Sequence, residues 1–262
     1  MQNAAGWFRA FVFLTASAVF SVPAFAQNAP VVAAAADLKF AMEEISQAFT
    51  AKTGKAVRLT FGSSGNFRRQ IAEGAPFEIF MSADEELVFA LAKEGYTLDE
   101  GALYAIGRVV IIVPHGSALK ADGELKDLAA GIQDGRVRKF AIANPEHAPY
   151  GRAAQQALTK AGLWNKLQDK LVLGENVSQA AQFATSGSAQ GGIIALSLAL
   201  SPSVGKLGDY AMLPAESHEP LRQRMVLLKK AGDVAKEFYM FVQQPHARAI
   251  FRRFGFVLPT EQ

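Results

Sequence analysis

Two short runs of small and hydroxyl-bearing residues, each followed directly by a predicted helix, are the parts of this chain best suited to hold a ligand. The first run covers residues 33–37 and ends in Asp37, and the second covers residues 62–66 and contains Ser63 and Ser64. Small residues let a ligand approach the backbone closely, and a helix start offers unpaired N–H groups and the positive end of a dipole. Two such starts after two consecutive strands predict a binding cleft for a small anion.

Three later segments add to this pattern. Helices are expected to open at residues 149–152 and 175–178, and a strand at residues 191–195 runs to the same edge. In a parallel α/β sheet, the carboxyl ends of strands and the amino termini of helices share one edge, where ligands bind. Each segment alone is an ordinary tight turn, but their number and a two-lobed layout together predict several donors converging on one anion.

Residue types that would support catalysis are scarce. The chain has no cysteine, which excludes thiol catalysis, cysteine-ligated zinc and iron–sulfur clusters. Its four histidines show no metal-ligand spacing, and neither a phosphate-binding P-loop nor a nucleophile elbow occurs. Ser117 and Lys120 match a Ser-x-x-Lys pattern whose partner motifs are missing. We therefore expect a binding protein without a cofactor or resident metal; an enzyme on the same scaffold is the alternative from another class.

Residues 1–26 have the pattern of a cleavable export signal. Arg9 is the only charged residue before Gln27, an apolar stretch runs from Phe11 to Phe20, and residues 24–26 form a small-x-small cleavage site. The apolar stretch is too short to span a membrane. We expect a periplasmic mature chain that begins near Gln27, with an uncleaved amphipathic anchor as the alternative.

Composition and charge fit an exported protein that folds around its own core. The chain has 262 residues, of which 50% are hydrophobic, and a formal net charge of +3. A charge this small, with both signs mixed and without a run of five basic residues, gives no reason to expect nucleic acid as a partner. We expect a monomer, and the length suits one large domain or two lobes of about 100 residues each.

Hydrophobic periodicity alternates between helix and strand along most of the chain. A helical stripe from Leu38 to Phe49 is followed by a strand around residues 57–61, and the alternation continues to Gly95. This βαβαβα pattern predicts a parallel sheet. Two strongly apolar strands, Val109–Val113 and Met225–Leu228, are candidate crossovers between two α/β lobes.

The expected boundaries follow from these crossovers. Residues 27–108 would form the first part of lobe I, and residues 109–224 would form lobe II together with a crossover strand. Residues 225–262 would hold the return crossover and the C-terminal helices, which pack on lobe I. This tail carries an aromatic stripe at helical spacing, formed by Phe238, Phe241, Phe251 and Phe254. We expect the stripe to serve core packing.

Several segments match the motifs of one protein family, and they are spread over the mature chain: residues 34–38, 61–65, 69–71, 74–76, 80–84, 144–151, 175–177, 216–218 and 253–256. On these residues the chain resembles the periplasmic molybdate-binding proteins, the solute-binding components of ABC importers. The resemblance implies a type II, two-lobed fold that closes on a tetrahedral oxyanion, molybdate or tungstate, without a cation contacting it. It also implies that the closed form docks on permease subunits in the inner membrane.

The resemblance further implies which residues contact the anion. Ser64, beside Ser63 in a Gly-Ser-Ser motif, would donate through its hydroxyl and its backbone. Tyr150 stands where members have alanine or tyrosine, and Val177 would donate its backbone N–H. Ala195 stands where some members place a tyrosine donor, for which Tyr150 can compensate. Selectivity over sulfate would come from the size of the cavity.

Asp37 departs from the family pattern, in which Ser or Asn is usual, and an ionised carboxylate facing a dianion is repulsive. Three interpretations remain open. Asp37 could cap its own helix, turn away from the anion and offer only its backbone N–H. It could be protonated, or accept a proton from the anion, so that a paralogous site selects hydrogen phosphate, arsenate or vanadate. It could also ligate the metal centre of the anion directly.

Overall fold

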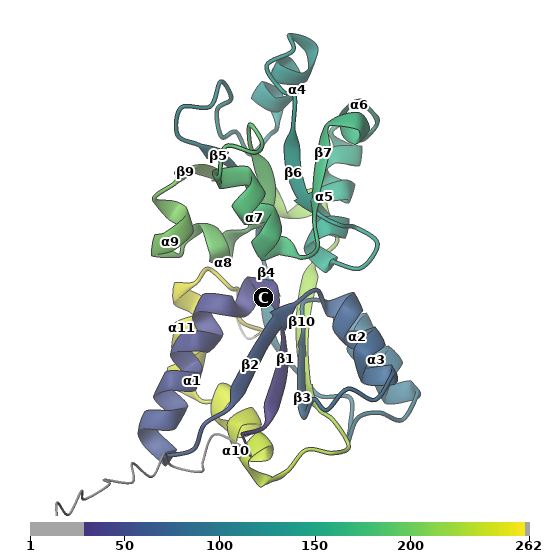
Figure 1. Cartoon of the computed structure of the whole chain (residues 1–262), viewed down its shortest axis with the longest axis vertical. Helices are drawn as coiled ribbons and strands as arrows, with labels where there is room; N and C mark the ends of the chain where they lie inside the picture. Colours follow the sequence, from purple (N-terminus) through teal and green to yellow (C-terminus); the bar gives the residue numbers. More distant parts are fainter. Residues whose placement is uncertain (1–28, 260–262) are drawn as a thin grey trace, which may run out of the picture.

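The computed structural model describes residues 29–259, which form two α/β lobes stacked end to end (Figure 1). The expected export signal, residues 1–26, lies outside the described residues. Each lobe is built around its own five-stranded sheet. Within residues 29–259, no helix is both long and apolar enough to cross a membrane.

The sheet of lobe I has the strand order β2-β1-β3-β10-β4. The strand β1 pairs in parallel with β2 and β3, whereas β10 runs antiparallel to β3 and β4. Its strands are β1 (Val31–Ala35), β2 (Arg58–Gly62), β3 (Ile79–Ser82), β4 (Ala102–Gly107) and β10 (Leu221–Leu227). The parallel part confirms the expected βαβαβα unit, and β10 closes it with a strand from the far end of the chain.

Helices cover both faces of this sheet (Figure 1). They are α1 (Lys39–Thr53), α2 (Ser64–Ala72), α3 (Glu85–Lys93), α10 (Asp233–Val242) and α11 (Pro245–Arg253). The tail helices α10 and α11 pack against α1, as the sequence predicted. The Phe49 ring meets those of Phe238 and Phe241 edge-on, with centroids 5.0 and 5.4 Å apart, so the aromatic stripe serves core packing.

The sheet of lobe II has the strand order β7-β6-β8-β5-β9. Its strands are β5 (Val109–Pro114), β6 (Phe140–Ala143), β7 (Leu171–Gly174), β8 (Gly192–Ala195) and β9 (Gly208–Met212). The helices of this lobe are α4 (Lys126–Gln133), α5 (Pro149–Lys160), α6 (Trp164–Leu167), α7 (Val177–Thr185), α8 (Leu196–Ala199) and α9 (Pro202–Gly205). The helices α5 and α7 pack against the central strands, and their amino termini face lobe I (Figure 1).

The chain passes between the sheets twice, once at Arg108 and once through residues 213–220. The predicted crossover strands therefore each lie within one sheet, and the crossovers themselves are short connections. The expected boundary at 224/225 is wrong, because β10 begins at Leu221 and its first residues belong to the first sheet. The polar residues Arg222 and Arg224 alternate with buried ones, so an apolar run shows only from Met225 onward.

Candidate ligand-binding site

A small cavity lies between the two lobes, at the carboxyl ends of β1 and β2 and the starts of α2, α5 and α7. Its lining residues are Ala35, Ala36, Asp37, Gly62, Ser63, Ser64, Ala83, Ala148, Pro149, Tyr150, Asn176 and Val177. The structure thus brings together five of the six residues singled out in the sequence, namely Asp37, Ser63, Ser64, Tyr150 and Val177. Both lobes contribute to the lining.

Three helices begin at this cavity and bring first-turn backbone N–H groups to it. The helix α2 starts at Ser64, and α5 starts with Pro149, whose missing N–H costs nothing at that position. The helix α7 starts at Val177, after Asn176, whose Oδ1 accepts from the N–H groups of Ser178 at 3.0 Å and Gln179 at 3.1 Å. First-turn N–H groups have no partner within a helix. The Asn176 cap uses those of Ser178 and Gln179, which leaves the N–H of Val177 as the donor of α7 toward the cavity.

The two serines at the start of α2 are held in different ways. Ser64 is fully buried, and its Oγ accepts a 3.0 Å hydrogen bond from the backbone N–H of Ala83. Because that lone pair is used, the hydroxyl proton of Ser64 remains for donation to a ligand. The Ser63 Oγ lies 2.9 Å from Nδ1 of His147, and the N–H of Gly65 donates to the carbonyl of His147 at 2.9 Å.

Asp37 is the least expected member of the site. Its side chain is 1% exposed, and its Oδ2 accepts hydrogen bonds from the Tyr150 hydroxyl at 3.0 Å and from Gln223 Nε2 at 2.6 Å. Its Oδ1 is the one buried side-chain polar atom in the described part of the chain that has no hydrogen-bond partner. The carbonyl of Asp37 accepts from the Ser197 hydroxyl at 2.7 Å.

The capping interpretation of Asp37 is wrong. Residues 36–38 form a 3-10 turn that leads into α1, and the carboxylate makes no capping hydrogen bond to either element. It bonds instead to Tyr150 of lobe II and to Gln223 of β10. The carboxylate accepts hydrogen bonds from these two distant donors in preference to a capping bond, because both donors are buried together with it.

Burial raises the pKa of Asp37 to about 6, and the hydrogen bonds from Gln223 and Tyr150 only partly offset this effect. The same burial, together with the negative charge of Asp37, raises the pKa of the Tyr104 and Tyr150 hydroxyls well above the usual value. Both phenols therefore remain protonated donors around a carboxyl group that titrates near neutrality.

Gln223 and Tyr104 belong to the same network, and the sequence reasoning missed both. The Tyr104 hydroxyl donates to Gln223 Oε1 at 2.8 Å, which turns Nε2 of the amide toward Asp37 and toward the Tyr150 oxygen at 3.2 Å. One signal was available for Gln223. It alternates with Leu221 and Met225 on the buried face of β10, and a polar residue in such a position needs a partner.

Ala195 is the predicted site residue that the structure does not bring to the cavity. It is fully buried at the end of β8, where it pairs with Val109 of β5, and it is absent from the cavity lining. The segment still reaches the lobe interface two residues later, because Ser197 bonds to the carbonyl of Asp37.

Further contacts join the lobes around the cavity rim. Arg152 of α5 forms an ion pair with Asp84 of lobe I, and Asn66 donates to Glu175. The Ser178 hydroxyl donates to the carbonyl of Ala36 at 2.9 Å. The lobes are thus in direct contact on several sides of the cavity, which is the arrangement expected of a closed cleft.

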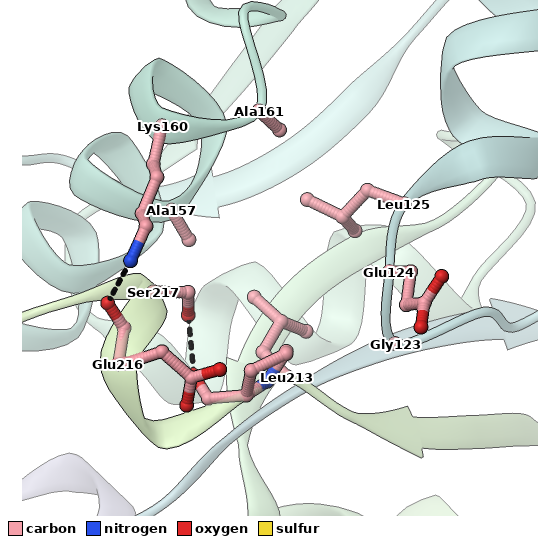
Figure 2. Close-up of a pocket in the computed structure, with 10 residues that line it drawn as sticks. Gly123, Glu124, Leu125, Ala157, Lys160, Ala161, Leu213, Glu216 and Ser217 are labelled. Carbon is pink, nitrogen blue, oxygen red and sulfur yellow. Dashed lines mark hydrogen bonds between the residues drawn. The ribbon is translucent and has the colours of Figure 1, made fainter.

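A larger hollow of about 550 Å³ lies within lobe II, between α5 and residues 213–217 (Figure 2). Its one cationic group, the ammonium of Lys160, already donates to the carbonyl of Glu216 at 2.6 Å. None of the residues predicted to contact an anion lines it. Within residues 29–259, no cluster of three or more acidic or histidine side chains could hold a metal ion.

Two sheets joined by short crossovers, with a small cavity between the lobes, define a periplasmic binding protein fold of type II. The family model described as "Bacterial extracellular solute-binding protein" matches residues 30–257, and the chain belongs to this family. It is therefore a solute-binding protein and not an enzyme.

Two relatives and one solved structure that are similar to this chain are molybdate-binding proteins. The molybdate-binding protein ModA of Rhodobacter capsulatus is 36% identical over 231 residues, which are 87% of each chain. ModA of Azotobacter vinelandii is 37% identical over 232 residues, covering 87% of this chain and 89% of the relative. The solved structure of the Azotobacter vinelandii periplasmic molybdate-binding protein superposes with a TM-score of 0.80 at 34% identity, over 88% of this chain and 99% of that one.

Proposed function

We propose that this protein captures molybdate, and tungstate with the same shape and charge, in the cavity between its lobes. The observation that carries the proposal is the convergence of three helix starts, from both lobes, at one small cavity. Neutral donors and helix dipoles suffice to hold a buried anion. Relatives that cover most of this chain are named for binding molybdate, which supports the choice of anion.

Ligand capture and delivery then follow from the fold. The anion would receive donors from Ser64 in lobe I and from the first turns of α5 and α7 in lobe II, so it would stabilise the closed form by bridging the lobes. The closed form, a monomer in the periplasm, would dock on the permease subunits of an ABC importer. Selectivity over sulfate would come from the size of the cavity.

A second candidate ligand is an oxyanion that carries its own proton, such as hydrogen phosphate, arsenate or vanadate. It is favoured by the free Oδ1 of Asp37, because an ionised carboxylate oxygen could accept that proton. This candidate leaves the two-lobed capture unchanged and alters only the ligand.

Isothermal titration of the chain from Gln27 onward, dialysed free of anions, tests the proposal. Molybdate and tungstate should bind tightly, with one anion per chain, while sulfate and phosphate give no heat. The variant Ser64→Ala should bind at least about tenfold more weakly, because a charge-assisted donor is lost. The control Ser188→Ala, at an exposed loop serine, should bind as the wild type does. Tight phosphate binding in place of molybdate would favour the second candidate.

A further inference from the structure

The hydrogen-bond network around Asp37 fixes which oxygen can carry a proton. Tyr104 donates to Gln223 Oε1, so the Gln223 amide must present Nε2 to Asp37 Oδ2 and to the Tyr150 oxygen. Since the Tyr150 oxygen accepts from Gln223, its own proton goes to Asp37 Oδ2. Both donors therefore point at Oδ2, and a proton on the carboxyl group must sit on Oδ1.

Among the residues that the structure describes, none forms an ion pair with this carboxyl group. The groups that face it are Tyr150 from α5, Tyr104 and Gln223 from β4 and β10, and Ser197 on its backbone. All are neutral, because burial raises the pKa of both phenols. An ionised Asp37 would therefore be a buried charge held by neutral donors alone, namely Gln223, Tyr150 and its own backbone N–H.

Several charged side chains of the neighbouring elements pair with groups other than Asp37. Arg152 pairs with Asp84, and the arginines on either side of Gln223 in β10 both pair with Glu85. His147, at the cavity rim, contacts Ser63 through Nδ1, and its Nε2 lies 3.6 Å from a Glu175 oxygen. None of these ion pairs includes Asp37, and no cation within residues 29–259 lowers its pKa, so a proton can neutralise the carboxylate.

A dianion bound in the cavity would favour protonation of Asp37 still more. Burial raises the pKa of Asp37 to about 6 without any ligand, and a neighbouring dianion raises it further. Once protonated, Oδ1 is a donor without an acceptor, and an oxyanion offers only acceptors. The unpartnered atom and the ligand then complement each other.

We infer that the carboxyl group of Asp37 binds the oxyanion in its protonated form, donating from Oδ1, so that each dianion captured near neutral pH takes up one proton from solvent. The inference rests on the proposed function and deepens it, because it assigns the proton to the protein and leaves the anion fully deprotonated. An anion with its own proton would be disfavoured, since two donors would then face each other. The one proton that enters comes from the buffer and ends on Asp37.

Titration calorimetry with molybdate at pH 7.0 to 8.5, in buffers of different ionisation enthalpy, counts the protons taken up. We expect a value near one per anion and an affinity that falls about tenfold per pH unit. In the variant Asp37→Asn, the side-chain oxygen can still accept the hydrogen bonds from Tyr150 and Gln223, and the amide NH₂ group replaces the protonated Oδ1 as donor. This variant should bind molybdate with no proton uptake and no dependence of affinity on pH. His147→Gln should keep the proton uptake, which excludes His147 as the site.

The outcomes separate this inference from the proposed function. Molybdate binding by the wild type without proton uptake would overturn the inference and leave the proposed function intact. Unchanged uptake in Asp37→Asn would also overturn it. Phosphate binding without uptake would place the proton on the anion. Absence of molybdate and tungstate binding at every pH would overturn the proposed function, and the inference with it. The number of protons that the wild type takes up tests the inference even if a variant fails to fold.

Discussion

Tyr150 and Asp37 lie 113 positions apart in the chain and in different lobes, yet the Tyr150 hydroxyl donates a 3.0 Å hydrogen bond to Asp37 Oδ2. Both side chains are buried, at 3% and 1% exposure, so this contact exists only while the lobes are together. The bond therefore links the protonation of Asp37, the one carboxyl group in the cavity lining, to closure of the cleft.

Replacing Tyr150 by phenylalanine should weaken molybdate binding about tenfold, which corresponds to ~1.4 kcal/mol. The ring would still fill its buried position, but the closed form would lose a donor between the lobes. Isothermal titration measures the effect. Tyr210→Phe, at an exposed position on β9, is the matched control and should bind as the wild type does. Equal affinity of the two variants would show that the Tyr150 hydroxyl plays no part in closure.

The variant Gly65→Ala should impair closure without disturbing either lobe. A Cβ atom at this position would lie 2.5 Å from the carbonyl oxygen of His147, which belongs to the other lobe. We expect at least a tenfold loss of affinity, on the order of 1.4 kcal/mol, and an unchanged free energy of unfolding without ligand. The control Gly232→Ala adds a Cβ that meets only a Glu78 oxygen at 3.4 Å. Wild-type affinity in Gly65→Ala would mean that the ligand-bound cleft is wider than this structure.

The stability of the closed protein should depend on pH through Asp37. Its folded-state pKa, about 6, lies above the ordinary value of 3.8, so the folded state holds the proton more tightly than the unfolded state. This stabilisation is complete below pH 3.8 and is lost as the pH rises through 6. Relative to Asp37→Asn, the wild type should lose about 2 kcal/mol in free energy of unfolding between pH 4 and pH 7. Urea titrations at both pH values measure this difference, and a difference of zero or of the opposite sign would contradict the raised pKa.

Replacing Gln223 by methionine should lower the free energy of unfolding by about 1–3 kcal/mol, because Tyr104 loses its acceptor and Asp37 loses one of its two donors. Chemical denaturation measures the loss. The control Gln243→Met alters an exposed glutamine and should cost little. If the two variants were equally stable, the buried network would contribute nothing to folding.

Much of the fold could be predicted from local pattern, because buried parallel strands and amphipathic helices have distinct periods. The strand expected around residues 57–61 is present as β2, Arg58–Gly62, one residue further along the chain. The edge strand β4 was missed, although its residues, Ala102–Gly107, are mostly apolar and none of them is exposed. The edge strand β9 also escaped prediction, since it mixes apolar with polar residues and is largely exposed. The start of β10 was missed for a similar reason.

The site likewise contains residues that could be predicted from local pattern and residues that could not. Asp37, Ser63, Ser64 and Val177 stand at the ends of strands or the starts of helices, and parallel topology alone places such positions at one edge. The partners of Asp37 do not follow from such a rule. Tyr104 and Gln223 lie 119 positions apart in antiparallel strands, and only the paired sheet brings them together. The side-chain direction of Asp37 was set by these distant donors and not by its own helix.

The most direct test of the account is a crystal structure of the protein grown with molybdate, with data collected at the molybdenum absorption edge. The account predicts one strong anomalous peak between the lobes, within hydrogen-bonding distance of the Ser64 hydroxyl and of the first-turn N–H groups of α5 and α7. Crystals that show a peak elsewhere, or no peak although the protein binds molybdate in solution, would contradict it.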